Sequence, residues 1–146
     1  MRAQVLAAML LSILLSFNAQ ARDTVVQVPL ADVLAMPEAQ SSLDGSVKFF
    51  LAGQSHPKVI ETKGSDVSNK KTNAFNKSDE FACRWTILSA LIAFQDSARR
   101  QGANAVIDIV SYYRSEESRN ASTIECHAGA LMAGAALKGT YAKIAK

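Results

Sequence analysis

The strongest constraint on the fold is one long helical segment at residues 78–101. Ser78 is a good N-cap, acidic residues follow it, and Gly102 is a natural residue just after a helix end. At 100° per residue, the apolar residues form two adjacent stripes that cover roughly half of the circumference, more than a surface helix needs. The stripes consist of Phe81, Trp85, Leu88 and Ile92, and of Cys83, Ile87, Leu91, Phe94 and Ala98. The pattern predicts a long helix packed heavily against a sheet.

Most of the remaining chain has the pattern of strands. Residues 104–114 are rich in β-branched and aromatic residues and are apolar on both faces apart from Asp108, which indicates a central strand. Residues 129–144 contain much alanine, which favours helix, but their spaced glycines favour an extended segment that closes the sheet. The other expected elements are strands at residues 24–28, 46–52, 58–63 and 123–128, a weak helical stretch at 31–42 interrupted at Pro37, and a polar hairpin connection at 115–121. Together they predict an α+β fold, with one long helix packed on a small, mostly antiparallel sheet.

Residues 64–77 form the one long polar segment. They include Lys70, Lys71 and Lys77 and few apolar anchors. A segment of this kind is a solvated loop, a loop that contacts a ligand, or a loop that conceals a short strand around Val67. We expect a solvent-exposed loop.

The first 21 residues have the three parts of a secretory signal peptide: a basic residue, an apolar run at residues 5–17 and small residues before the cleavage position. The apolar run is too short for a transmembrane helix, which needs about 20 residues. A buried N-terminal helix is the alternative. We expect cleavage between Ala21 and Arg22, which leaves one small α+β domain at residues 22–146. The product would be periplasmic or secreted, without a stable membrane anchor.

Export determines the role that we expect for the two cysteines, Cys83 and Cys126. In an oxidising compartment, two cysteines most simply form one disulfide. Cys83 lies in the apolar arc of the predicted helix, and Cys126 shares a strand face with the apolar Ile124. We therefore expect a disulfide between Cys83 and Cys126.

A metal site or a catalytic thiol is the alternative role for these cysteines. His127 directly follows Cys126, and His56 is the only other histidine. Neighbouring residues of a strand point to opposite faces, so Cys126 and His127 could not bind the same ion. The chain has none of the C-x-x-C, H-E-x-x-H or H-x₃₋₅-H spacings. No metal and no cofactor are predicted.

The charge balance argues against a protein that binds nucleic acid. The chain has 16 basic and 13 acidic residues and a net charge of +3, which is too even for a nucleic-acid footprint. It also lacks a G-x₄-G-K-[ST] phosphate loop. Neither an ATPase nor a nuclease is predicted.

Two charged residues fall on surfaces that are predicted to be buried. Arg84 lies within the apolar arc of the helix, and Asp108 interrupts the apolar central strand. Because a buried charge needs a partner, we expect Arg84 and Asp108 to form a buried polar pair. A role in ligand binding is the alternative.

Residues 98–107 (ARRQGANAVI) have the pattern of a helix end, a GANAVI step and a strand start. Over about residues 78–138, the chain resembles small α/β modules of the YbjQ kind and of the Rcs envelope stress-sensor lipoprotein. That lipoprotein carries an acylated N-terminal cysteine and two disulfides, whereas this chain has no cysteine at its cleavage region and can form one bridge only. The resemblance therefore implies a fold but no sensor function. YbjQ-like modules carry a name that refers to heavy metals, but this sequence has no cluster of metal ligands.

The whole mature chain more closely resembles a group of small exported proteobacterial proteins. These proteins often carry the automatic label "excinuclease ATPase subunit", which the missing phosphate loop and the signal peptide contradict. The segments that carry the resemblance are residues 43–49 (LDGSVKF), 56–59 (HPKV), 69–73 (NKKTN), 125–129 (ECHAG) and 136–139 (ALKG).

These observations predict a non-enzymatic envelope protein: a binding, structural or interaction module. Its partner would be an unknown envelope protein or a small ligand. No catalytic residues are assigned, because no convergent catalytic set is visible. The alternatives are a small, hydrolase-like periplasmic enzyme and a secreted effector. The candidate side chains of an enzyme are His56, Asp66, Asp108, Glu125 and His127.

Overall fold

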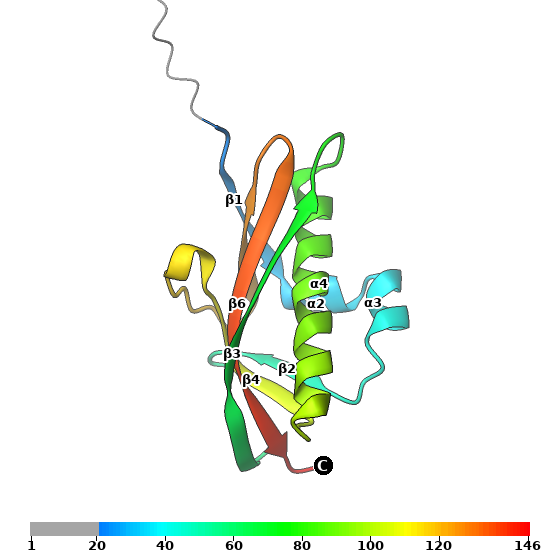
Figure 1. Ribbon diagram of the computed structural model, residues 1–146, viewed down its shortest axis with the longest axis vertical. Coiled ribbons are helices and arrows are strands. Elements are labelled where there is room, and N and C mark those ends of the chain that lie inside the picture. Colours follow the sequence, from blue (N-terminus) through cyan, green and yellow to red (C-terminus); the bar gives the residue numbers. More distant parts are fainter. Residues whose placement is uncertain (1–20) are drawn as a thin grey trace, which may run out of the picture.

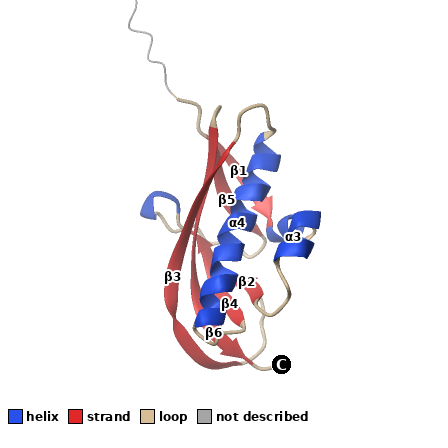
Figure 2. Ribbon diagram, turned by 45° about the vertical axis from the view of Figure 1, so that its right-hand side comes forward, coloured by secondary structure: helices blue, strands red, loops and turns tan. Residues whose placement is uncertain are grey.

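The computed structural model describes residues 21–146, so the expected signal peptide lies outside the described residues except for its last one, Ala21. The described chain forms one long helix, α4 (Asp79–Arg100), packed on a curled six-stranded sheet (Figures 1 and 2). The expected α+β architecture is confirmed.

Helix α4 begins where the sequence predicts. The Ser78 hydroxyl accepts a hydrogen bond from the backbone N–H of Phe81 at 3.2 Å, which satisfies one of the free donors at the helix start. The buried arc is narrower than expected, because Phe81 and Trp85 remain 46% and 39% exposed. The rest of the apolar arc faces the sheet, as expected.

Five strands form the path of the sheet. In the order of their pairings they are β1 (Thr24–Pro29), β5 (Thr123–Ala128), β6 (Met132–Ile144), β4 (Ala105–Ser111) and β2 (Lys48–Leu51). The pairings are antiparallel apart from β2 with β4, which is parallel. Strand β4 is central, and β6 is the extended C-terminal segment, so both of these expectations are confirmed. Near its start β6 pairs with β5, and further along it pairs with β4.

The sixth strand, β3 (Val59–Asn73), corrects the expectation of a solvent-exposed loop at residues 64–77. It pairs with the other edge of β6 from end to end. Ser68 is its one buried side chain, and the Ser68 hydroxyl donates a hydrogen bond to the Ala90 carbonyl of α4 at 3.1 Å. A strand so exposed needs no apolar alternation, which is why its sequence has the polar composition of a loop.

The expected hairpin between β4 and β5 is also wrong, because these strands form no ladder with each other. Both pair with the same edge of β6, β5 near its start and β4 further along. The connection passes through a short 3₁₀ turn, η1 (Tyr113–Ser115), in which Arg114 and Ser115 have positive φ angles. In Figure 1 this connection lies on the side of the sheet away from α4.

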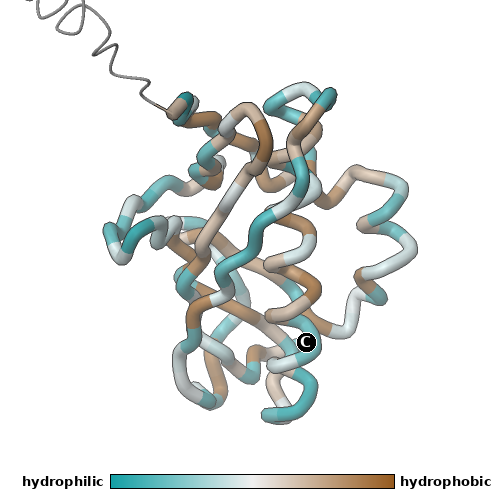
Figure 3. Tube along the Cα trace, turned by 45° about the horizontal axis from the view of Figure 1, so that its top comes forward, coloured by the Kyte–Doolittle hydropathy of each residue, from teal (hydrophilic) through white to brown (hydrophobic). Residues whose placement is uncertain are grey.

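Two short helices, α2 (Leu30–Leu34) and α3 (Pro37–Ser42), match the interrupted helical stretch, with Pro37 in the first turn of α3. They lie on the same side of the sheet as α4 (Figure 1). The main core lies between these helices and the sheet, and the hydrophilic stretches lie mostly at the periphery (Figure 3). Its largest fully buried side chains include Ile87, Leu91, Phe94, Ile109, Ile124, Leu137 and Tyr141.

Arg84 and Asp108 do not form the expected buried pair. The Arg84 guanidinium lies 3.7 Å from the carboxylate of Asp32, and the Asp108 carboxylate lies 2.8 Å from the guanidinium of Arg119. All four side chains are exposed. Arg84 lies at the margin of the helix facing α2, and Asp108 lies at a β-bulge with a φ of 53°, which breaks the alternation of β4.

Candidate functional site

The expected disulfide is confirmed: Cys83 of α4 is bonded to Cys126 of β5, with 5.8 Å between their Cα atoms. Both cysteines are fully buried. The bridge ties the first half of α4 to the sheet and indicates an oxidising compartment. None of the helices formed by residues 21–146 is long and apolar enough to cross a membrane.

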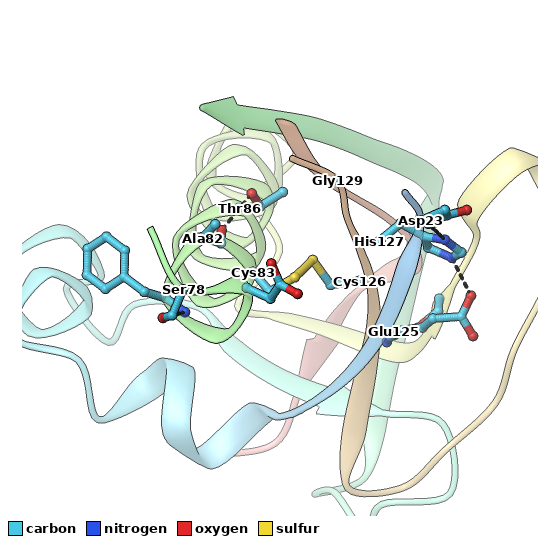
Figure 4. The surroundings of a disulfide bond; sticks show 12 residues. Asp23, Ser78, Ala82, Cys83, Thr86, Glu125, Cys126, His127 and Gly129 are labelled. Carbon is cyan, nitrogen blue, oxygen red and sulfur yellow. Dashed lines mark hydrogen bonds and ion pairs between the residues drawn. A yellow bond between two sulfur atoms is a disulfide. The ribbon is translucent and has the colours of Figure 1, made fainter. Parts of the chain in front are cut away.

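Strand β5 presents two chemically different faces. Cys126 points toward α4, whereas its neighbours Glu125 and His127 lie on the opposite, outer face of the sheet (Figure 4). The sequence predicts this division from the period-two pattern of the strand. The disulfide therefore fixes the backbone of β5 directly behind His127.

The imidazole of His127 is held between two carboxylates. Its Nδ1 lies 2.9 Å from Asp23 Oδ1, and its Nε2 lies 2.8 Å from Glu125 Oε1 (Figure 4). Each ring nitrogen is therefore within hydrogen-bond distance of a carboxylate oxygen. Since both ring nitrogens are engaged, neither is free to accept a proton from a substrate.

The ring of Tyr113 covers the His127 imidazole. The ring centroids are 3.6 Å apart and the planes differ by 11°. Gly134 of β6 lies directly opposite His127, and a Cβ atom there would come within 3.5 Å of the Tyr113 ring. A side chain larger than alanine at this position would therefore meet the tyrosine ring, which lies flat over the sheet. The guanidinium carbon of Arg114 lies 5.3 Å from the Tyr113 ring centroid, within the range of a cation–π contact.

A depression of about 450 Å³ opens beside this stack. Three cationic side chains line it: Arg22, Lys71 of β3 and Arg114. We call it the outer-face depression. Its remaining wall is formed by Ala21 and Asp23, by the stacked rings, and by residues 129–134, which connect β5 to β6 and begin β6.

The three cations differ in how they are bound. Arg22 makes two hydrogen bonds to the Asp79 carboxylate, at 2.7 and 3.0 Å, and a third to the Gly129 carbonyl. The hydrogen bonds between this pair raise the pKa of Arg22 and lower the pKa of Asp79. Within residues 21–146, neither Lys71 nor Arg114 forms a salt bridge. Two positive charges are therefore available to a ligand in the outer-face depression.

The structure separates most of the candidate side chains of the enzyme hypothesis. His56 is exposed beside Phe50, with its Nδ1 2.8 Å from the Pro57 carbonyl, and it forms no salt bridge with any residue that the structure describes. Asp66 accepts a hydrogen bond from the Tyr141 hydroxyl at 3.2 Å on the α4 side of the sheet. Asp108 pairs with Arg119, as described above. Only Glu125 and His127 come together.

The sequence interpretation missed Asp23, Tyr113 and Lys71 as neighbours of His127. Each comes from a different element, and their proximity depends on strand register. β1 pairs with β5 so that Val25 faces His127, which places Asp23 near the imidazole. Lys71 pairs with Gly134, which in turn pairs with His127. Only a correct prediction of how β3, β6 and β5 pair would have placed these residues together.

Among the described residues, no group of three or more histidine, cysteine or acidic side chains is placed to hold a metal ion. No protein-family model matches the chain, and no curated protein matches it.

Proposed function

We propose that this protein is an exported, non-catalytic binding module of the cell envelope that holds an anionic ligand in the outer-face depression. The observation that carries the proposal is the pair of cations without carboxylate partners, Lys71 and Arg114, beside the stacked rings of Tyr113 and His127.

The chemistry of these groups favours a carboxylate or phosphate ligand. A guanidinium offers a planar fork of donors that fits either anion, and a lysine ammonium adds a mobile positive charge. The nearby carboxylates of Asp23 and Glu125 are both directed to His127, so they compete little for Lys71 and Arg114. The aromatic surface of Tyr113 adds a flat apolar contact.

Two features support a binding role over hydrolysis. The His127 nitrogens are both hydrogen-bonded to carboxylates, which removes the usual base of a hydrolytic site. The other candidate side chains, His56, Asp66 and Asp108, lie apart from His127. Purified protein should accordingly turn over neither ATP nor simple ester substrates, and stoichiometric turnover of either would contradict this assignment.

The proposed location rests on the disulfide together with the signal-peptide pattern before Arg22. N-terminal sequencing of the exported product should give Arg22 as the first residue. Recovery of the protein from membranes with Met1 retained would contradict the proposed processing.

The ligand proposal is tested by titrating the exported protein with two anionic probes, citrate and inorganic pyrophosphate, followed by calorimetry. The variants Lys71→Gln and Arg114→Gln keep most of the side-chain length and remove the charge. Each should weaken the binding of a probe by about ten- to 100-fold, since a charge-assisted hydrogen bond contributes about 1.5–3 kcal/mol.

Lys143→Gln is the matched control, because Lys143 is exposed near the opposite end of β6. It should leave the dissociation constant unchanged. If neither probe binds, or if all three variants weaken binding equally, the outer-face depression is not an anion site.

A further inference from the structure

Strand β3 leaves one of its edges without a partner strand. One edge pairs with β6, and within residues 21–146 no strand pairs with the other edge (Figure 2). From Gly64 to Asn73 the pairing with β6 has no bulge, so this stretch of β3 is regular. A regular edge presents a row of unpaired backbone N–H and C=O groups, to which another strand can bond. We call the unpaired side of residues 64–73 the free edge.

The pairing with β6 determines which residues direct their backbone groups to the free edge. The Ala136 carbonyl of β6 accepts a hydrogen bond from the Tyr112 N–H at 2.7 Å, on the side of β6 where β4 lies. Because backbone direction alternates along a strand, Leu137 faces the other way and pairs with Ser68 of β3. The β3 residues one and three positions from Ser68 therefore direct their N–H and C=O groups outward. These residues are Ser65, Val67, Asn69 and Lys71.

The α4 side of the free edge carries side chains of both charges. Asp66 and Lys70 lie two positions before and after Ser68, which bonds to α4, so all three share this face. The Asp66 carboxylate accepts hydrogen bonds from the Tyr141 hydroxyl at 3.2 Å and from the Val67 N–H at 2.8 Å. Lys70 forms no salt bridge with any residue that the structure describes. Both charged side chains border a depression of about 370 Å³ between β3 and α4.

A second copy of the chain fits the free edge in an antiparallel arrangement. Two-fold symmetry centres such a pairing on one residue, and each outward-facing residue must lie opposite another outward-facing residue. With the centre at Ser68, Asp66 of each copy lies opposite Lys70 of the other. The outward-facing residues of the two copies then also pair with one another, Ser65 with Lys71 and Val67 with Asn69.

The charges of the free edge favour this register over its neighbours. Within residues 64–73, a centre at Asp66 or at Lys70 would place two like charges directly opposite each other, which is destabilising. A centre at Val67 or at Asn69 would bring no opposite charges together. Of these centres, only Ser68 gives pairs of opposite charge, and by symmetry it gives two. Ser68 also lies near the middle of the regular stretch, so this register pairs nearly its whole length.

We propose that two copies of this chain associate antiparallel through the free edges of β3, with the pairing centred on Ser68, and so join their sheets into one. The side chain of Lys71 stays on the outer face, where it lines the outer-face depression. The association therefore does not depend on the ligand proposed for that depression.

The surroundings of Asp66 accommodate this pairing. When the copies associate, the Val67 N–H exchanges its bond to Asp66 for a bond to a backbone carbonyl of the second copy. That exchange frees one carboxylate oxygen for Lys70 of the second copy, while the other oxygen keeps the Tyr141 hydroxyl. Arg100 also borders this depression, but it lies in the last turn of α4, where the helix end favours a cation.

The association is tested by analytical ultracentrifugation of the exported protein over a range of concentrations, in which the parent should form a dimer. Lys70→Glu reverses the charge opposite Asp66 in both copies and should raise the dimer dissociation constant at least tenfold. The matched control is Lys58→Glu, which makes the same change of charge at an exposed lysine just before β3. It should dimerise as the parent does.

An exchange of charges tests the register. Asp66→Lys and Lys70→Glu should each self-associate weakly, but an equimolar mixture of the two should associate as tightly as the parent, because opposite charges then face each other at both positions. Circular dichroism establishes that both variants keep the fold.

Three results would overturn the proposal: a parent that stays monomeric up to millimolar concentration, a Lys70→Glu variant that dimerises as tightly as the parent, or a mixture that does not associate. None of these substitutions alters a residue of the outer-face depression. The binding of citrate and pyrophosphate should therefore be the same in all the variants, which separates this test from that of the depression.

Discussion

The ring of Tyr113 stacks on the imidazole of His127 with 3.6 Å between centroids, and Gly134 provides the space beneath the tyrosine. The stack joins the connection after β4 to strand β5, although these strands form no ladder with each other. It thereby fixes Arg114, the next residue, at the rim of the outer-face depression. A small residue at position 134 is thus a condition for the geometry of the proposed binding site, because a Cβ atom there would already touch the Tyr113 ring.

Substitutions of Gly134 should show whether this residue sets the position of the Tyr113 ring. A Cβ atom at this position would make ordinary contacts at 3.5 and 3.6 Å, so Gly134→Ala should retain the stack. Gly134→Val adds two further methyl groups beyond that Cβ atom and should displace Tyr113. The measurement is the ring-current shift of the His127 protons by NMR, which should change in the valine variant and stay in the alanine variant. An unchanged shift in Gly134→Val would show that Gly134 does not set the position of Tyr113.

Substitution of Gly139, which lies on the opposite face of β6, should instead destabilise the core. A Cβ atom there would lie 2.6 Å from Val106 Cγ1 and 3.2 Å from Ile109 Cγ1, closer than atoms of the packed core allow. Gly139→Ala should lower the free energy of unfolding by about 1–3 kcal/mol through overpacking. Urea denaturation measures the effect, with Gly134→Ala as the matched control. Equal midpoints for the two variants would contradict this account of the core.

The helix and the disulfide could be predicted because their signals are local. The capping residue Ser78 and the apolar arc define α4, and period-two alternation places Cys126 inward. Only the start of strand β3 gave such a signal, in the strand expected at residues 58–63. Its exposed edge position allows a polar sequence, and only the pairing with β6 reveals it as a strand. The predicted hairpin failed for the same reason, because adjacency in the chain does not determine adjacency in a sheet.

The candidate site was predictable only in part. Alternation along β5 correctly places Glu125 and His127 together, but Asp23 and Tyr113 reach His127 through tertiary pairing. The pair Arg84 and Asp108 failed because each lies at a local exception to its pattern. Arg84 is at the margin of the helix arc, and Asp108 is at a bulge where the backbone turns aside.

Tyr141 should make the protein less stable in alkali. Its side chain is buried, and its hydroxyl donates to Asp66 at 3.2 Å. Burial, and to a smaller extent the Asp66 charge, raise the pKa of Tyr141 above its ordinary value. Because the folded state disfavours the phenolate, its contribution to stability is fully present below the unfolded pKa of about 10 and is lost as the pH rises above it.

Replacing Tyr141 with phenylalanine removes this titration. The free energy of unfolding of the parent should fall between pH 9 and pH 11 by more than that of Tyr141→Phe, as measured by urea denaturation at each pH. Parallel pH profiles for the two proteins would show that the Tyr141 hydroxyl titrates alike in the folded and unfolded states.

The bond between Cys83 and Cys126 should supply a large part of the stability. It closes a sequence separation of 43 residues, for which the chain-entropy model gives about 4 kcal/mol, a large fraction of the total for a small domain. Cys83→Ser/Cys126→Ser should lower the free energy of unfolding by up to this amount in urea. Both cysteines are fully buried, so a soluble thiol should reduce the parent slowly under native conditions and rapidly in denaturant. Thiol counting on the exported protein checks the premise. Two free thiols after export would mean that these cysteines serve another role, and a variant as stable as the parent would mean that packing alone holds α4 on β5.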